Sequence, residues 1–243
     1  MTGAAPLRAG VIAAGRGDRL RHGRPVPKPL VPVGGRPLID HVLESIADAD
    51  AAEVCIIIND DSIAVRDHVS AARWPFALSW IVESTPSSMH SFLRVLETVA
   101  EADGTNRVLM STVDTIAPRG AYRRFVADAA RLGDAAVALA VTTVTDDENP
   151  LLVRMEGSAM VALGDAAGPE SYATAGYYLV SPAVLREADA ARRDGLGSLR
   201  AFFARLLARG YPIAGVRVPP SIDVDRPSDV AAAEDVLKAW VGL

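Results

Sequence analysis

AGVIAAGRGDRLRHGRPVPKPLVPVGGRPL, residues 9–38, begins with a short apolar run and passes directly into a loop rich in glycine and arginine. The apolar run predicts a buried strand. Gly15 and Gly17 have no side chain, so backbone N–H groups of the loop can approach an anion closely. Three cationic side chains lie in the same stretch: Arg16, Arg19 and Lys28. The stretch therefore predicts a strand followed by a loop that binds a polyphosphate.

Lysine is nearly absent from this chain. Of the 25 lysine and arginine residues, only Lys28 and Lys238 are lysine. Arginine stands at almost every other basic position. A lysine in the glycine-rich segment therefore indicates that a compact ammonium charge is needed there. Lys28 is therefore a candidate for direct contact with phosphate.

Both halves of the opening stretch resemble the start of the nucleotidyltransferase family that includes the sugar-1-phosphate pyrophosphorylases. Members of that family open with a strand, a G-x-G-[TSD]-R-[LM] loop and a PKPL-[LV]-P-[VI]-x-G-x-P-[LI] segment. Residues 15–20 read GRGDRL, and residues 27–38 read PKPLVPVGGRPL. A dinucleotide-binding loop would need a third glycine where Leu20 stands, and a Walker loop would need Gly-Lys-Ser/Thr. A purely structural turn is the remaining alternative.

Length and composition favour one soluble, cytoplasmic domain over residues 1–243. Half of the residues are hydrophobic, yet no apolar run approaches the roughly 20 residues that a membrane-spanning helix needs. The first ten residues lack the pattern of a signal peptide. The net charge of −5 argues against nucleic-acid binding as the main role. Cys55, the single cysteine, has no partner for a disulfide or a thiolate metal site. We expect no membrane or nucleic-acid partner, and a homo-oligomer is left open.

Short apolar strands alternate with helical segments in the first half of the chain. This order predicts an α/β fold with a doubly wound, mostly parallel, Rossmann-like sheet and helices on both of its faces. The expected strands cover residues 9–14, 53–58, 77–82, 107–112, 136–144 and 212–218. The expected helices cover residues 38–48, 61–72, 89–102, 119–132, 182–193, 197–209 and 227–241.

Residues 145–180 have a different pattern. A polar turn at residues 146–150 is followed by short apolar runs at 151–155, 159–163 and 172–180. The pattern predicts a small β-rich insertion that covers the carboxyl ends of the strands, which is where open α/β sheets bind ligands.

A second motif, RVLMSTVDT, spans residues 107–115. Its first part predicts a buried strand, and Asp114 emerges at the carboxyl end of that strand. A carboxylate there can hold Mg²⁺ together with phosphate oxygens, because Mg²⁺ uses few protein ligands and several waters or phosphates. Alternatively, Asp114 or Thr115 caps the helix that begins near Pro118. In the resembled family this strand usually ends in Gly-Asp, and Val113 stands at the glycine position here.

A third motif, SIDVDRPSD, spans residues 221–229 and leads into an alanine-rich helix. Asp223 and Asp225 point to the same side if the segment is extended, so either can supply a second carboxylate to the metal. The motif resembles the family pattern D-[IV]-[DG]-[TR]-P-x-D, by which Asp223 matches the metal-binding aspartate. The reverse assignment stays open. Asp229 is explained more simply as a favourable anion in the first turn of the helix.

Two weaker segments complete the pattern. Residues 87–91, SSMHS, stand where the family has a small-residue loop that contacts the base, and the alternative is a serine N-cap with His90 on an exposed turn. Residues 172–178, YATAGYY, resemble the family's [NT]-x-G-[IL]-Y strand, whose backbone lies close to the sugar. Gly176 fits a close approach to ligand. A β-bulge with the two following tyrosines alternating between core and surface is the alternative.

Together the motifs imply transfer of a nucleotidyl group from an NTP to a sugar 1-phosphate or a sugar-like cyclitol phosphate, with Mg²⁺ as cofactor and pyrophosphate as the second product. By the resemblance, Arg19 stabilises the departing phosphates and Lys28 bridges the α-phosphate and the incoming phosphate. The metal candidates are Asp114, Asp223 and Asp225. The nucleotide-binding candidates are Ala13, Ala14, Gly15, Arg16, Gly17, Asp18 and Ser88. The acceptor-binding candidates are Glu148, Thr174 and Gly176.

Three rival functions stay open. A cytidylyltransferase acting on a non-sugar phosphate, such as choline phosphate or a phosphonate, would share every motif. A nucleotide-sugar-dependent glycosyltransferase uses an Asp-x-Asp motif, which residues 223–225 spell near the C-terminus, but such enzymes lack the PKPL segment. A nucleotide-binding subunit without catalytic activity is the third. The base, the acceptor and the oligomeric state are not set by these motifs.

Overall fold

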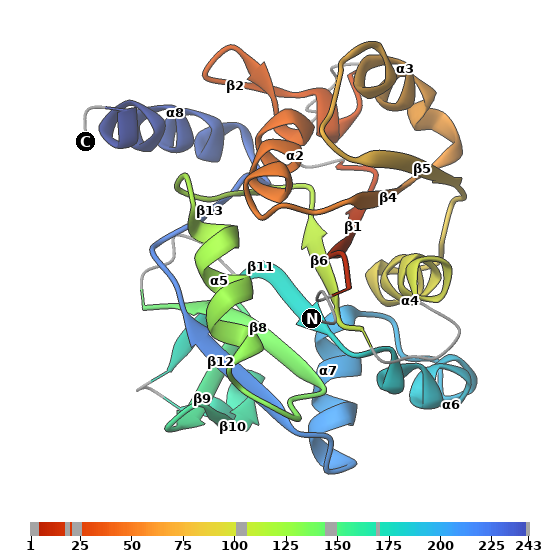
Figure 1. Cartoon of the computed structure of the whole chain (residues 1–243), viewed down its shortest axis with the longest axis vertical. Helices are drawn as coiled ribbons and strands as arrows, with labels where there is room; N and C mark the ends of the chain where they lie inside the picture. The colour runs from red at the N-terminus through yellow and green to blue at the C-terminus, as the bar shows by residue number, and fades with distance from the viewer. Residues whose placement is uncertain are drawn as a thin grey trace.

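The structure is a computed structural model and describes residues 5–17, 20, 26–100, 106–143, 150–168 and 171–241 (Figure 1). Three residues that the motifs single out lie outside these ranges, namely Asp18, Arg19 and Glu148. The other candidate residues lie within them.

The described residues form a nine-stranded sheet and two ladders of two short strands each. The strands of the large sheet are β1 (Arg8–Ala13), β4 (Glu53–Ile58), β5 (Ala77–Val82), β6 (Val108–Thr112), β8 (Val137–Thr142), β9 (Leu152–Glu156), β10 (Ala159–Leu163), β11 (Tyr172–Val180) and β12 (Ile213–Arg217). They lie in the order β5-β4-β1-β6-β11-β8-β12-β10-β9.

The half of the sheet that contains β1 is parallel and doubly wound. The chain passes outward from β1 to β4 and β5, and then returns to β6 on the other side of β1 (Figure 1). This is the arrangement that alternating strands and helices predict. The carboxyl ends of β1 and β6 therefore meet where the strand order reverses, and open α/β sheets bind ligands at that point.

Strand β11 differs from the expectation for the β-rich segment. It belongs to the middle of the main sheet, where it runs antiparallel to both β6 and β8. Its alanine, tyrosine, leucine and valine side chains are mostly buried on both faces, as a central strand requires. The hairpin of β9 and β10 lies at the far edge of the sheet, although β9 also pairs with the start of β11. The segment is therefore a central strand and an edge hairpin rather than one separate insertion.

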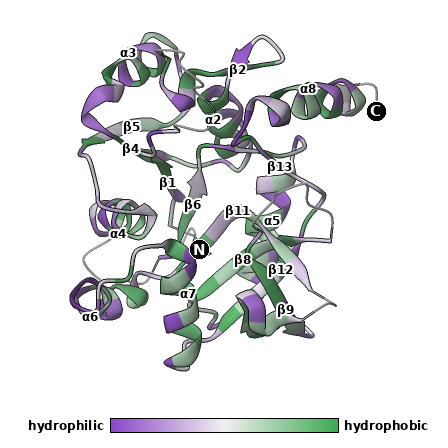
Figure 2. Cartoon of the chain, turned by 180° about the vertical axis from the view of Figure 1, so that it is seen from behind, coloured by the Kyte–Doolittle hydropathy of each residue, from purple (hydrophilic) through white to green (hydrophobic). Residues whose placement is uncertain are grey.

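Helices cover both faces of the sheet, as predicted. The helices are α2 (Leu38–Asp48), α3 (Ile63–Ala71), α4 (Ser88–Val99), α5 (Ala121–Ala130), α6 (Ala188–Arg193), α7 (Leu199–Ala208) and α8 (Pro227–Val241). One apolar core joins the sheet to α4, α6 and α7, and a second core on the opposite face joins it to α2, α3 and α5. Figure 2 shows hydrophobic residues along the central strands and hydrophilic residues on outer parts of α3 and α6.

Element boundaries agree closely with the sequence periodicity. Strands β4 and β5 and helices α2 and α8 begin and end at the predicted residues. Two predicted helices each begin with a 3₁₀ segment instead: η2 (Asp60–Ser62) precedes α3, and η4 (Pro182–Glu187) precedes α6. A proline near the start of η4 and the Asn59 cap of η2 favour tight first turns.

Two ladders of two-residue strands are not apparent from the sequence. Strand β2 (Pro32–Val33) pairs with β3 (Arg36–Pro37) directly after the PKPL segment. Strand β7 (Thr115–Ile116) pairs with β13 (Ile222–Asp223), so the second and third motifs lie side by side. Helix α8 then packs against β2, where Gly34 N donates a hydrogen bond to Glu234 Oε1 at 3.1 Å.

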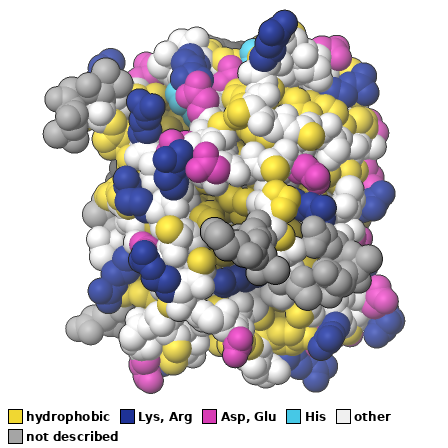
Figure 3. Space-filling model, in the orientation of Figure 1, with side chains coloured by type: hydrophobic (Ala, Val, Ile, Leu, Met, Phe, Trp, Pro, Cys, Tyr) yellow, Lys and Arg dark blue, Asp and Glu magenta, His cyan; other side chains and the backbone are white. Residues whose placement is uncertain are grey.

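The surface carries both signs of charge. Figure 3 shows basic and acidic side chains interspersed over the face that it presents, with hydrophobic side chains gathered at its upper right. Among the described residues, no helix is long and apolar enough to cross a membrane.

Candidate functional site

Lys28 lies at the centre of the site. It begins the short 3₁₀ segment η1 (Lys28–Leu30), and only 7% of the residue is exposed. Its Nζ donates to Asp114 Oδ2 at 2.7 Å and to Asp225 Oδ1 at 2.5 Å. The structure thus joins the three motifs through one ammonium group, and each motif contributes one charged side chain.

The two carboxylates keep the buried lysine charged. Burial disfavours the ammonium form, but the charges of Asp114 and Asp225 outweigh burial and raise the pKa of Lys28. Burial likewise disfavours the Asp114 carboxylate, yet the neighbouring Lys28 charge lowers the pKa of Asp114 below its usual value. The Lys28 ammonium therefore lies between two carboxyl groups that favour its charged form.

A small apolar core explains why residues so far apart in the sequence meet here. Val31 and Val33, which follow Lys28, pack in one cluster with Val224, which precedes Asp225. The Val224 N–H also donates to the Asp114 carbonyl oxygen at 3.0 Å. Burial of these apolar side chains stabilises the packing of the PKPL segment against the third motif. This packing brings the charged side chains of Lys28, Asp114 and Asp225 into contact.

Asp223 and Asp225 have different partners, although only Val224 separates them. Asp223 Oδ1 accepts a hydrogen bond at 2.7 Å from the hydroxyl of Thr115, which lies opposite it in the β7–β13 ladder. Asp225 lies beyond the end of β13 and turns to Lys28. The extended geometry that would make the two aspartates equivalent ends at Asp223.

The capping alternative for Asp114 and Thr115 is wrong. Gly120 is the N-cap of α5, and the helix has no side-chain cap. The side chains of Asp114 and Thr115 bond instead to Lys28 and Asp223. The helix starts at Ala121, too far along the chain for either residue to be its N-cap.

Asp229 has the simple role expected of it. It lies in the first turn of α8, and its Oδ2 accepts hydrogen bonds from Asp225 N at 3.0 Å and Arg226 N at 2.8 Å. These bonds fix the backbone that carries the Asp225 side chain toward Lys28.

The glycines of the opening loop have two distinct roles. Gly17 has a φ of +64°, and a Cβ on it would stand 2.4 Å from the Lys28 Cβ, so the loop backbone packs directly on the lysine stem. By contrast, no described atom lies within 4 Å of where a Cβ on Gly15 would stand. Gly17 is required by packing, whereas none of the described residues fills the space beside Gly15. Arg16, between them, is exposed.

The end of β1 leads into this loop. Ala13 is fully buried in the sheet, and the following residue, Ala14, is only partly buried. The Ala14 carbonyl accepts a hydrogen bond at 3.0 Å from Nδ2 of Asn59, a buried residue at the end of β4. The motifs do not reveal this contact of Asn59 with the opening loop, and the position of Asn59 directly after a strand is the signal that could have found it.

The structure places Ser88 at the start of α4. Its hydroxyl accepts a hydrogen bond from Leu199 N at 3.1 Å, which ties α4 to α7. Ser87 is the N-cap of α4 and also contacts the ring of His90 through Oγ and Nδ1 at 2.9 Å. The serine N-cap given as the alternative is confirmed for Ser87, but His90 lies in the first turn of α4 and is partly buried rather than on an exposed turn. A contact between Ser88 and the base stays a prediction.

Gly176 is required by a close approach within the protein. Its φ is +76°, and a Cβ on it would stand 1.9 Å from Thr115 Oγ1. The β11–β8 register shifts between Thr174 and Tyr178, so the expected bulge is present. The expected alternation of the next two residues between core and surface is wrong, because helices cover both faces and both Tyr177 and Tyr178 are buried.

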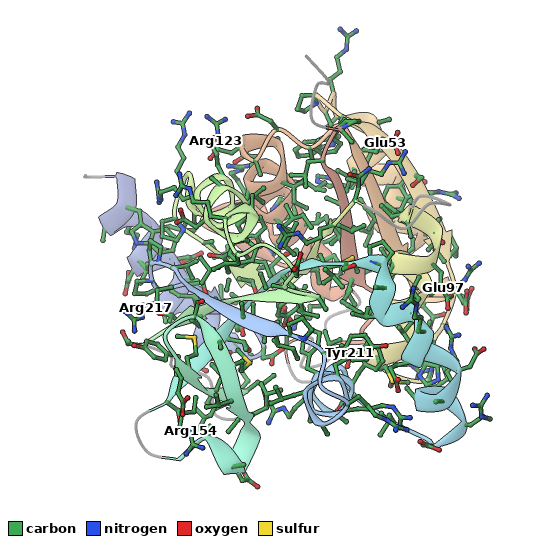
Figure 4. All side chains as sticks on the ribbon, turned by 60° about the horizontal axis from the view of Figure 1, so that its bottom comes forward. Glu53, Glu97, Arg123, Arg154, Tyr211 and Arg217 are labelled. Carbon is green, nitrogen blue, oxygen red and sulfur yellow. The ribbon has the colours of Figure 1, made fainter. Side chains whose placement is uncertain are left out.

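Thr174 is the third residue of β11, near the end of that central strand that lies beside the carboxyl end of β6. It is partly buried and pairs with Val141 of β8. Nearby, the Arg217 guanidinium lies over the Tyr172 ring, 5.1 Å from its centre. Figure 4 shows Arg217 on β12 and, farther away, Arg154 on the β9–β10 hairpin; both residues are exposed.

The donor set at the centre fits Mg²⁺. Within the described ranges, no group of three or more histidine, cysteine, aspartate or glutamate side chains could hold a metal ion. Mg²⁺ does not need one, because it is commonly bound by one or two carboxylates and by substrate phosphates. Asp114 and Asp225 already converge on one cation, the Lys28 ammonium.

Residues 9–208 match the protein family described as "MobA-like NTP transferase domain". The chain belongs to the MobA-like NTP transferase family. The resemblance, the nucleotidyltransferase class and the α/β fold predicted from the sequence are therefore confirmed. The family match covers β1 through α7 and so includes Lys28 and Asp114, while Asp223 and Asp225 lie beyond it.

Two curated relatives illustrate the range of this family. The chain is 30% identical over 217 residues to CMP-5'-(3-aminopropyl)phosphonate synthase of Streptomyces rubellomurinus, covering 86% of this chain and 32% of that protein. It is 31% identical over 144 residues to the bifunctional protein GlmU of Desulfotalea psychrophila, covering 59% of this chain and 40% of that protein. The chain thus spans less than half the length of either relative.

Solved structures share the fold from end to end. The inositol-1-phosphate CTP transferase of T. maritima superposes with a TM-score of 0.82 at 17% identity, covering 98% of this chain and 97% of that one. A UDP-glucose pyrophosphorylase complexed with UDP-glucose gives a TM-score of 0.78 at 13% identity, covering 96% of this chain and 99% of that one. At such low identity these likenesses establish the fold alone.

Proposed function

We propose that this NTP transferase domain joins a nucleoside monophosphate unit, taken from an NTP, to a small phosphorylated or phosphonate acceptor. The observation that carries the proposal is the contact of Lys28 with both Asp114 and Asp225, next to the open backbone at Gly15. This combination brings together, at the switch point of the sheet, a cation, two carboxylates that we propose as metal ligands, and a glycine beside which the described residues leave space.

The reaction follows from the charges. An oxygen of the acceptor phosphate attacks the α-phosphorus in line, the bond from that phosphorus to the β-phosphate oxygen breaks, and pyrophosphate leaves with the bonding electrons. The attacking oxygen is already ionised, so no general base is needed. The protein has to align two anions and neutralise their repulsion.

Each residue then has a defined role. Lys28 moves its ammonium contact from the carboxylates to the α-phosphate and the incoming phosphate, whose charge redistributes in the transition state. The loop at Gly15 and Gly17 contributes backbone donors, and Arg19 neutralises the departing phosphates, a role that rests on the motif. Asp114 and Asp225 would hold Mg²⁺, which supplies charge neutralisation when bound.

Asp223 takes a supporting role in this proposal. Its bond to Thr115 holds β13 against β7, and this pairing sets the position of Asp225 at the end of the ladder. We therefore assign the second metal-binding carboxylate to Asp225, the alternative that the third motif leaves open.

We propose cytidylyl transfer to a phosphonate or to a sugar-like phosphate as the more specific form of this reaction. It is favoured by the 30% identity, over 86% of this chain, to a protein named as a CMP-phosphonate synthase. The fold neighbour named as an inositol-1-phosphate CTP transferase points to the same nucleotide. We also propose that the enzyme acts in the cytoplasm, where nucleoside triphosphates are available.

The test is pyrophosphate release from each of the common NTPs against a panel of sugar 1-phosphates, cyclitol phosphates, choline phosphate and aminoalkylphosphonates. The expected result is release that needs one NTP, one acceptor and Mg²⁺ together. A glycosyltransferase would release no pyrophosphate, and a non-catalytic subunit would bind NTP without turnover. Either result contradicts the proposal.

A further inference from the structure

The hydrogen-bond ladder between β1 and β4 ends at the entrance to the nucleotide loop. The last paired residues are Ala13 and Ile58, and the next residue on each strand is Ala14 and Asn59. Asn59 is 6% exposed, and its Nδ2 donates to the Ala14 carbonyl at 3.0 Å. The side chain therefore supplies a donor to Ala14 directly beyond the end of the backbone ladder.

The other end of the Asn59 amide fixes its orientation. Oδ1 accepts hydrogen bonds from Asp61 N at 3.1 Å and from the Ser62 hydroxyl at 2.7 Å. An amide turned the other way would direct its NH₂ group at the Asp61 N–H and its oxygen at a carbonyl. The NH₂ group is thus committed to Ala14, and the carbonyl of Ala14 is held at a set position.

The same turn also holds a second loop. Asp60 N donates to Ser84 Oγ at 3.3 Å, and Ser84 N donates to Asp60 Oδ2 at 3.2 Å. Ser84 precedes the 87–91 segment at the start of α4. Residues 59–62 thus join the two segments that flank the predicted position of the base, one at Ala14 and one before Ser87.

We propose that Asn59 is a positioning residue for the nucleotide, which sets the Ala14 peptide from which the phosphate-binding loop starts. The inference rests on the proposed function. Because β1 and β4 are already paired along their full length, the Asn59–Ala14 bond is not needed to form the sheet. Its loss therefore acts where β1 leads into the loop, directly beyond the last backbone pair of the ladder.

The sharpest variant is Asn59→Asp. It keeps the shape of the side chain and the oxygen that caps η2, but it replaces the donor to Ala14 with an acceptor. Asn59→Ser is the uncharged companion, because serine is also a good N-cap but has no amide group to reach the Ala14 carbonyl. Ser62→Ala is the matched control, since it removes a bond to Asn59 Oδ1 and leaves the bond to Ala14 intact.

The experiment measures steady-state constants for the NTP and for the acceptor, direct NTP binding by calorimetry, and thermal unfolding. We expect both Asn59 variants to raise the KM and Kd for NTP about tenfold, the scale of one lost buried hydrogen bond. The acceptor KM should change by less than about twofold, a shift of under 0.5 kcal/mol. Ser62→Ala should bind NTP as the unchanged protein does.

Two results would overturn the inference. If either Asn59 variant folds and has the same KM and Kd for NTP as the wild-type protein, Asn59 does not position the nucleotide. Parallel losses for NTP and acceptor, together with a large fall in Tm, would reduce it to a structural residue. If the unchanged protein neither binds nor consumes any NTP, the proposed function and this inference both fail. If the wild-type protein turns over and the Asn59 variants have the same KM and Kd for NTP, only this inference fails and the proposed function stands.

Discussion

The proposed phosphate end and the proposed acceptor end of this site are built differently. At the phosphate end, Lys28 is buried and bonded to two carboxylates that come from distant motifs. At the proposed acceptor end, Thr174 is partly buried and Arg217 is exposed, and both pair with Val141 of β8. The comparison supports our proposal that a buried, charge-paired centre carries out the chemistry, whereas the acceptor is selected by more exposed side chains that can change at little cost to the fold.

Loss of the central lysine should have the largest effect. Lys28→Ala is expected to lower kcat by about 10²-fold or more, because one preorganised donor to a developing charge is worth that much. Lys238→Ala is a natural control, since Lys238 is the only other lysine and forms an exposed pair with Asp235. Pyrophosphate release by the two variants measures the difference. Equal activities would remove Lys28 from the mechanism.

The two aspartates of the third motif should respond differently to the same change. Asp225→Asn removes a charge that holds the cation, so the Mg²⁺ concentration for half-maximal activity should rise about tenfold or more. Asp223→Asn keeps an oxygen that can accept the Thr115 hydroxyl, so the Mg²⁺ requirement should change little. Mg²⁺ titrations of both variants, with calorimetry of metal binding, decide the assignment. The reverse order of effects would make Asp223 the ligand.

A smaller effect, on stability, is expected at Gly176, where β11 approaches Thr115 closely. Gly176→Ala forces a Cβ against Thr115 at a left-handed φ, so unfolding should become easier by about 1–3 kcal/mol. Gly157→Ala is the control, because Gly157 has a similar φ of +63° but no described atom within 4 Å of the added carbon. It should cost only about 1 kcal/mol. Denaturant unfolding curves compare them, and equal losses would show that the close approach to Thr115 is unimportant.

The smallest effect is expected at the acceptor border. Arg217→Ala removes a guanidinium from the exposed face of Tyr172, a contact worth about 0.5–1 kcal/mol at such sites. The acceptor KM should therefore change by only a few fold, and the NTP constants should not change. Steady-state kinetics with each substrate varied in turn test this. A loss as large as that in Lys28→Ala would mean that the acceptor end is part of the catalytic centre.

Much of the fold could be predicted because it depends on local pattern. Strand β4 and helix α2 have apolar spacing and end signals that set their limits without reference to the rest of the chain. The central place of β11 could not be predicted, since it depends on which strands it pairs with rather than on its own residues. The two-residue strands β7 and β13 are too short to show any periodicity.

The site shows the same division. Lys28 and Asp114 were found because motifs and strand ends mark them. The choice between Asp223 and Asp225 depends on the register that places Asp223 opposite Thr115, and this register is a contact across 108 residues of sequence. Asn59 gave no motif, because a single amide after a strand is informative only once its neighbour in space, Ala14, is known.

The most direct test of the central claim is ³¹P NMR of the protein with Mg²⁺, CTP and a set of phosphorylated and phosphonate acceptors. The account predicts free pyrophosphate and, in equal amount, a new pair of coupled signals from the nucleotide α-phosphorus joined to the acceptor phosphorus. Both should be lost in Lys28→Ala and kept in Lys238→Ala. Formation of CDP and inorganic phosphate, or no change with CTP or any other NTP, would contradict nucleotidyl transfer at the Lys28 centre.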